Sequence, residues 1–244
     1  IRRVTFDLTG LPPTVDEVSR FAADDSPGAT EKLVDQLLAS PRFGEHWGQH
    51  WLDLMRFAET QGHEQDYTIP QAFRYRDYVI RALNGDVPYD RFVTEHVAGD
   101  LVGEPRLDPI ARTNDSILGT GFWHLGEAAH SPVDIRGEEA ERIANQIDVF
   151  SRAFLGLTVA CARCHSHKFD AISTEDYYGL TGYLQSSSYH IADISDPGAH
   201  RQAERELRLL KDEFATQLRK SDGIALAVEA RRVSEYLLGA RTIL

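Results

Sequence analysis

The residues best suited to chemistry in this sequence are its two cysteines, which lie three positions apart and are followed directly by a histidine. They form the run Cys161-Ala162-Arg163-Cys164-His165. This spacing matches the attachment sequence of c-type haem, in which each thiol bonds to a vinyl group of the porphyrin and the histidine binds the iron. We therefore predict one covalently attached haem c, with His165 as the proximal iron ligand.

Three other uses of the cysteine pair remain open at the level of the sequence. A thioredoxin-like redox pair would lie between a strand and the start of a helix, whereas this pair follows a predicted helix. A tetrahedral zinc site would need both thiols, a nearby histidine and one remote ligand. The third alternative is a plain disulfide or two inert thiols. The haem interpretation uses both thiols and His165 without any remote residue.

The second axial position on the iron decides between two kinds of function, because an open position lets a substrate bind. Met55 is the only methionine, and we expect it in the core of an aromatic helix. His130 and His190 lie in loop-like segments and are our candidates for the second iron ligand. His167 is too close to His165 to reach the opposite face. We assign His167 and Lys168 to haem propionates or to a polar network that holds the motif loop.

The elements that must position these residues are predicted to be helices. Apolar residues recur at helical spacing, and Thr14 and Glu17 form a capping box. A helix from Glu138 to Leu157 leads to the cysteines, and Thr174 opens the next one. Further helices are predicted from about residue 30 to 40, 43 to 57, 71 to 84 and 89 to 98, with a loop-rich region over 99–137. The fold class is therefore mainly α, an irregular multi-helix domain with long loops around the haem.

The chain is predicted to consist of two parts. Residues 1–198 form the haem-binding domain. Residues 199–244 carry a narrow apolar stripe among many charges, which predicts a C-terminal helical hairpin, a coiled coil or a linker toward missing sequence. Because the first residue is Ile1 rather than Met, we expect an excerpt or a processed chain.

Composition excludes some partners. The 244 residues include 26 Lys and Arg against 38 Asp and Glu, which gives a formal net charge of −12. Such a chain repels a phosphate backbone, so we expect no nucleic-acid partner. No apolar run approaches the 18 residues that a membrane-spanning helix needs, so we expect no transmembrane segment.

Further phrases of the sequence extend the signal of the cysteine motif over residues 1–190. They are RRVTFDLTGLPPT at 2–14, HWLDL at 50–54, YRDYVI at 75–80, PYDRF at 88–92, AGDL at 98–101, FLGLTVACARCH at 154–165, HKFD at 167–170 and DYY at 176–178. Together they resemble the planctomycete-type cytochrome c domain family. The resemblance implies an exported haem c protein of little-understood function, normally followed by a second conserved domain. Ser166 departs from that pattern, since the family usually has Asp there.

These observations predict an exported c-type cytochrome domain that acts in electron transfer. Its partner would be a redox protein or its own missing C-terminal domain. One alternative is a haem c-dependent oxidoreductase that acts on an organic substrate such as a carbohydrate. The other is a non-enzymatic domain stapled by haem or zinc. Because haem c is attached outside the cytoplasmic membrane, we expect a periplasmic, cell-surface or secreted location.

Overall fold

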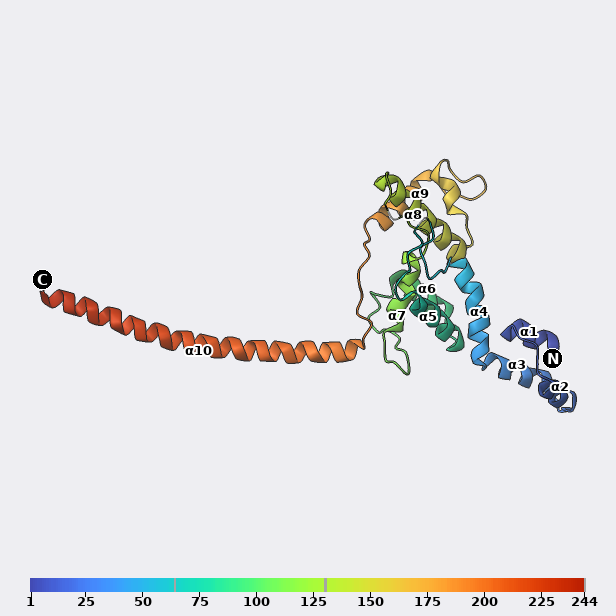
Figure 1. The fold of residues 1–244 in the computed structure, drawn as a ribbon, viewed down its shortest axis with the longest axis horizontal. Helices are drawn as coiled ribbons and strands as arrows, with labels where there is room; N and C mark the ends of the chain where they lie inside the picture. Colours follow the sequence, from blue (N-terminus) through green and yellow to red (C-terminus); the bar gives the residue numbers. More distant parts are fainter. Residues whose placement is uncertain (64, 130, 244) are drawn as a thin grey trace. The chain divides into compact units, whose positions relative to one another are not determined.

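The regular elements of the protein are helices. The computed structural model describes residues 1–63, 65–129 and 131–243, and within these ranges it contains no strand. Two isolated bridges join Thr60 to Thr68 and Leu107 to Asn114. The mainly helical class predicted from the sequence is therefore confirmed. By its contacts the chain divides into two compact units, residues 1–194 and 195–244 (Figure 1).

The first unit begins with four short helices: α1 (Arg2–Thr9), α2 (Val15–Ala22), α3 (Ala29–Leu38) and α4 (Pro41–Leu54). The predicted capping box at the start of α2 is present. The Glu17 amide donates to Thr14 Oγ1 at 3.3 Å, and the Thr14 amide donates to the Glu17 carboxylate at 2.7 Å. Both bonds satisfy amides that the first turn of a helix leaves open. The short helix α1, which packs on α3 and α4, was not predicted.

The main core lies where α4 packs against α5 (Ala72–Asn84), with α6 (Tyr89–Ala98) and the 3₁₀ helix η1 (Gly119–His124) beside them. Helix α5 contributes more of its buried residues than any other element, because its apolar residues recur at helical spacing along one side. Met55, directly after α4, is fully buried here, as predicted. The fully buried members of this core also include Tyr78, Val79 and Phe122.

A buried group of charges joins α5 and α6 to the short helix α7 (Asp115–Leu118). Asp115 is fully buried and accepts from Arg81 at 2.6 Å and from Arg106 at 2.9 Å. Arg106 also donates at 3.0 Å to Glu95, which is fully buried as well. Each buried carboxylate is thus paired with arginines, which offsets the cost of removing its charge from water.

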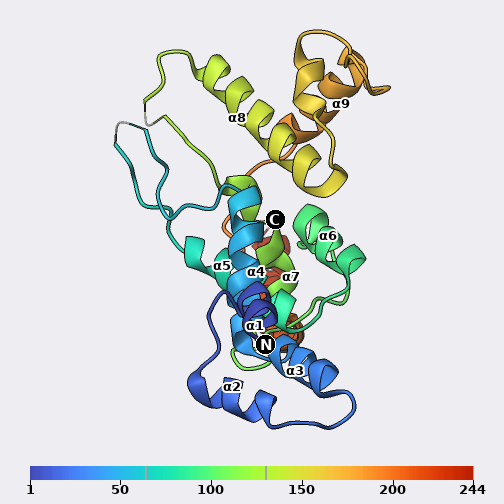
Figure 2. The ribbon, with the colours of Figure 1, turned by 90° about the vertical axis from the view of Figure 1, so that its right-hand side faces the viewer.

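A second, smaller core lies under α8 (Ile135–Phe150), the 3₁₀ helix η3 (Val159–Arg163) and α9 (Thr174–Gln185). Figure 2 shows α8 and α9 next to each other in the first unit. The last turn of the α8 segment widens into a π-helix over Ser151–Leu155, labelled η2, before the chain enters the cysteine motif. The helix predicted over 138–157 is therefore α8 followed by this π turn.

The second unit consists mainly of α10 (Pro197–Ile243), one unbroken helix of 47 residues (Figure 1). The predicted hairpin is therefore wrong. The middle of this helix, around Ser221, Asp222 and Gly223, contains no proline. A single glycine costs a helix only about 1 kcal/mol, which does not suffice to break it.

Candidate functional site

The cysteine motif lies on a 3₁₀ helix that separates its buried residues from its thiols. A 3₁₀ helix has three residues per turn, so residues three apart lie on the same side. Val159 and Ala162 are buried in the smaller core. Cys161 and Cys164, also three apart, are free and exposed. Cys161 lies within this helix, η3, and Cys164 directly follows it, so the buried Val159 and Ala162 anchor a segment whose two cysteines are exposed.

Two side-chain contacts fix the motif to its neighbours. Arg163, between the cysteines, donates both terminal nitrogens to the Glu141 carboxylate on α8, at 2.6 and 3.1 Å. This bidentate bond raises the pKa of the Arg163 guanidinium above its usual range. From α9, the Tyr178 hydroxyl donates to the Arg163 carbonyl at 3.2 Å. The backbone between the thiols is therefore held from both flanking helices.

The imidazole of His165 is exposed and is oriented by one backbone bond. Its Nδ1 lies 2.8 Å from the Ser166 carbonyl, which can only accept, so Nδ1 carries the proton. This tautomer leaves the lone pair on Nε2, the nitrogen that can bind a metal. A metal-binding histidine in proteins usually donates its other ring N–H in this way. The acceptor is backbone, so the side chain at position 166 does not decide the bond.

His167 belongs to a polar network that closes the loop after the motif. Its Nδ1 accepts from the Asp170 amide at 2.9 Å and from the Phe169 amide at 3.3 Å. Nε2 therefore carries the proton and donates to Thr158 Oγ1 at 2.9 Å. Both ring nitrogens of His167 are thus engaged within the protein. Lys168 is exposed, with its ammonium 5.2 Å from the centre of the Phe169 ring.

The remaining ligand candidates lie in different settings. His190 is exposed in the loop after α9, with Nε2 2.7 Å from Ser188 Oγ. His130 lies outside the described residues. Met55 is buried in the main core and has no exposed sulfur to offer.

The geometry of the motif can be compared with what each use of the cysteines requires. Both thiols are free, so they are not joined as a disulfide. The pair follows α8 and lies on η3, not between a strand and a helix as in a thioredoxin-like site. Over the described part of the chain, no three His, Cys, Asp or Glu side chains gather as a metal-binding group. A tetrahedral zinc site would require such a group. Exposed thiols beside an imidazole with a free Nε2 meet the requirements of haem attachment.

Sequence reasoning missed Arg56, which follows α4. Its Nε and Nη1 are buried and have no hydrogen-bond partner. Burial lowers the pKa of this guanidinium.

Sequence reasoning also missed Tyr189. Its hydroxyl donates to the Trp123 carbonyl at 2.9 Å and accepts from Gln146 at 2.7 Å. No local spacing marks either residue, because their neighbours come from distant parts of the chain.

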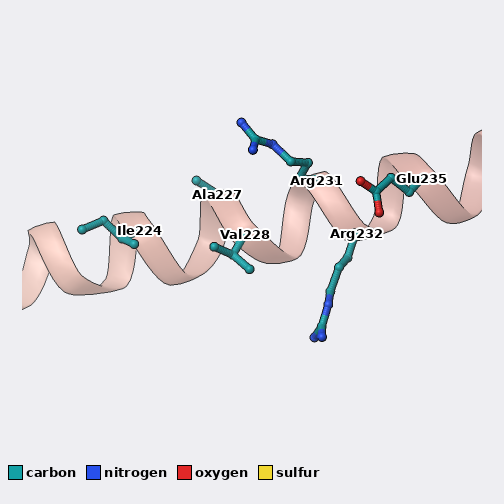
Figure 3. A pocket seen from close by; sticks show the side chains of 6 residues that line it. All are labelled: Ile224, Ala227, Val228, Arg231, Arg232 and Glu235. Carbon is teal, nitrogen blue, oxygen red and sulfur yellow. The ribbon is translucent and has the colours of Figure 1, made fainter.

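Surface hollows occur on α10. The one in Figure 3 is lined by Ile224, Ala227, Val228, Arg231, Arg232 and Glu235. All six side chains come from one helix and point in different directions, so the hollow has no opposing wall. Among the described residues, no helix is both long enough and apolar enough to span a membrane.

Comparison with known proteins places the chain in a family. A family model, PSCyt2, described as a protein of unknown function (DUF1549), matches residues 1–189. The match covers more than half of the chain, which therefore belongs to this family. No curated protein and no solved structure matches the chain.

This match corrects the family resemblance drawn from the sequence phrases. The matching model describes a domain of unknown function, not a cytochrome c domain, and its description names no haem. The assignment to the planctomycete-type cytochrome c domain family was therefore wrong. The phrases mark membership of the family of unknown function, and any argument for a cofactor must come from the chain's own residues.

Proposed function

We propose that the chain carries one covalently attached haem c and acts in electron transfer. One observation carries the proposal: Cys161 on η3 and Cys164 directly after it are both free and exposed, and the Nδ1-protonated imidazole of His165 follows them. When bound, such a haem supplies an iron that exchanges one electron between its ferrous and ferric states. The thiols would hold it by thioether bonds, and Nε2 of His165 would bind the iron.

The exposure of the motif favours electron transfer over chemistry on a bound substrate. Small-molecule sites are usually concave and bury most of their ligand. Here both cysteines and His165 are exposed, so a partner protein can approach the cofactor edge. The partner would be a redox protein or a further domain of the same polypeptide. Attachment of haem c takes place outside the cytoplasmic membrane, so the proposal entails a periplasmic, cell-surface or secreted protein.

The chain's own residues would orient the cofactor rather than react. The Ser166 carbonyl holds the His165 ring in its metal-binding tautomer. The Arg163–Glu141 pair keeps the two thiols at a fixed spacing. Lys168 is exposed next to the motif, where its charge suits a propionate. His130 or His190 would supply the second iron ligand.

The test is production of the protein together with a haem c attachment system. We expect a pigment with sharp reduced cytochrome bands that stays with the protein in acid acetone. Cys161→Ser and Cys164→Ser should each weaken its retention, and the double variant should abolish it. Lys32→Ala on α3 is the control, because this lysine lies outside the motif and its loss leaves the thiols, His165 and Lys168 in place. Pigment released into acid acetone from the wild-type protein, or zinc instead of iron in metal analysis, would refute the proposal.

The second iron ligand can be found in the same material. His130→Ala and His190→Ala are compared with His63→Ala, a control histidine that was not a candidate. The variant that removes the ligand should change the spectrum from low-spin to high-spin and allow carbon monoxide to bind. If neither variant does so, these two histidines are not ligands. A wild-type protein that already binds carbon monoxide would favour a haem c-dependent oxidoreductase.

A further inference from the structure

Two histidines lie one turn apart at the surface of α4. His46 is half-buried and His50 is exposed, and the centres of their rings are 4.9 Å apart. Residues four apart in a helix lie on the same face, so the backbone of α4 holds the two imidazoles next to each other. Gly44 and Gly48 of the same helix are buried against α5. The pair is therefore carried by a helix that is packed on its other side.

The ring nitrogens of this pair are not used inside the protein. Among the residues that the structure describes, neither His46 nor His50 has a hydrogen bond or an ion pair. His46 packs the Nδ1 edge of its ring against Gly10, where a Cβ would lie 2.5 Å from Nδ1, so its Nε2 lies on the far side of the ring. In His167, by contrast, both ring nitrogens are bonded within the protein. The pair thus offers free nitrogen lone pairs at the surface.

We propose that His46 and His50 together bind one divalent transition-metal ion, each through one ring nitrogen. Imidazole is a good ligand for Cu²⁺, Ni²⁺ and Zn²⁺, whereas Ca²⁺ and Mg²⁺ prefer oxygen. Of the three, Cu²⁺ binds most tightly to a given set of nitrogen ligands. The ligand is therefore a first-row transition ion, with Cu²⁺ as the strongest binder.

The separation of the two rings suits a shared ion. A metal–nitrogen bond of about 2.0 to 2.1 Å puts each ring centre about 3.2 Å from the ion. Two imidazoles that meet the ion between a right angle and the tetrahedral angle then have ring centres about 4.5 to 5.2 Å apart. The observed 4.9 Å lies within this range. Binding therefore requires the rings to rotate but not to move apart.

This site is separate from the cysteine motif. Helix α4 packs in the main core, whereas the motif lies on the smaller one. Over the described residues, no third His, Cys, Asp or Glu side chain joins the pair, so water fills the remaining positions on the ion. Structural sites usually surround their ion with four protein ligands. A site with two protein ligands and several waters instead binds its ion reversibly.

The experiment titrates the full chain with Cu²⁺ after any free thiols have been alkylated, so that Cys161 and Cys164 neither bind nor reduce the ion. Calorimetry gives the dissociation constant, and electron paramagnetic resonance counts the nitrogens bound to copper. We expect one ion with two nitrogens in the wild type. His46→Gln and His50→Gln should each leave one nitrogen and raise the dissociation constant at least about tenfold.

His124→Gln is the matched control. His124 is also exposed and also meets an aromatic ring edge-on, that of Tyr189, but it has no histidine one turn away. This variant should bind Cu²⁺ as the wild type does. If either variant of the pair keeps two nitrogens and the wild-type affinity, the proposal is overturned. The nitrogen count does not depend on haem attachment, so a failure of the proposed function leaves this test intact.

Trp47 provides a second readout within the site. Its ring centre lies 6.1 Å from that of His46 and 5.5 Å from that of His50. A Cu²⁺ ion held by the pair should therefore quench the fluorescence of Trp47. Trp47→Phe should remove this quenching while calorimetry still detects the ion. Quenching of the same size in Trp47→Phe would place the ion near another tryptophan and would also overturn the proposal.

Discussion

His96 is a histidine whose neutral form is built into the main core. It is fully buried, its Nδ1 donates to the Phe92 carbonyl at 2.8 Å, and its Nε2 accepts from the Tyr75 hydroxyl at 2.9 Å. The Trp51 indole N–H lies 3.3 Å from the same nitrogen. Burial lowers the pKa of His96 to about 4. Protonation would disrupt this arrangement, because Nε2 would lose its lone pair.

The lowered pKa of His96 predicts a pH-dependent stability. The unfolded chain takes up a proton near pH 6.5, whereas the folded chain does so only near pH 4, so the free energy of unfolding falls as the pH drops between these values. From pH 7.5 to 4.5, the wild type should lose about 2 to 3 kcal/mol more than His96→Gln. Urea unfolding at both pH values measures this. Parallel pH curves for the two proteins would contradict it.

Removal of the buried charge of Asp115 should lower the free energy of unfolding. Asp115→Asn removes the charge that Arg81 and Arg106 share. Because Arg106 keeps Glu95 and Arg81 keeps Asp108, the variant should lose about 1.5 to 3 kcal/mol of unfolding free energy. The control is Asp148→Asn, whose ion pair with Arg152 is largely exposed and should change stability by less than about 1 kcal/mol. Equal effects of the two variants in chemical denaturation would show that the buried pair is not specially stabilising.

At the scale of elements, α6 and α7 approach each other at Gly99. A Cβ on Gly99 would collide with the carbonyl oxygens of Ser116 and Glu95, and these backbone atoms cannot rotate away. Gly99→Ala should therefore destabilise the protein by about 1 to 3 kcal/mol.

The control for Gly99 is Gly179→Ala in α9, where an added Cβ meets nothing within 4 Å. Alanine favours a helix over glycine, so this variant should be stabilised by up to about 1 kcal/mol. The two melting temperatures should move in opposite directions. If both variants lose stability, the prediction is wrong, because the open space around Gly179 would then not allow alanine to stabilise its helix.

The sequence predicts elements that local patterns determine. The capping box of Thr14 and Glu17, the helical spacing in α4 to α6 and the burial of Met55 are all present in the structure. The spacing of Cys161, Cys164 and His165 also identified them as a candidate site, and their role stays a prediction.

The contacts that could not be predicted join side chains from distant parts of the sequence. Arg81, Glu95 and Arg106 meet only because α5, α6 and the loop before α7 fold together. The same holds for Arg56, whose surroundings come from Gly126 and α8. The single helix α10 was missed for another reason. Its narrow apolar stripe among many charges was interpreted as the packing face of a hairpin, but a stripe alone does not show where a helix ends.

At the scale of the whole molecule, α10 differs from the rest in how it is stabilised. Nearly all of its described side chains are exposed, including Leu207, Phe214 and Leu218. Most helices in proteins depend on packing of an apolar face, and an unpacked helix frays and reopens rapidly. Taken by itself, the second unit is therefore stabilised by the local hydrogen bonds of its helix.

Hydrogen exchange tests this contrast. Amides of α10 should exchange much faster than those of α5, whose residues Tyr78 and Val79 are fully buried. The measurement is peptide-resolved exchange at low protein concentration. Slow exchange in α10 that speeds up on dilution would contradict the prediction, because it would show that the helix is packed in an assembly.

The division of η3 into a packed side and a solvent side bears on how the protein matures. Val159 and Ala162 complete the small core without help from the sulfur atoms, which lie outside it. Under the proposed function, folding and haem attachment would be separable events, because the attachment enzyme would meet the thiols on a folded surface. In this respect the cofactor would be an addition to the domain and not a template for its folding.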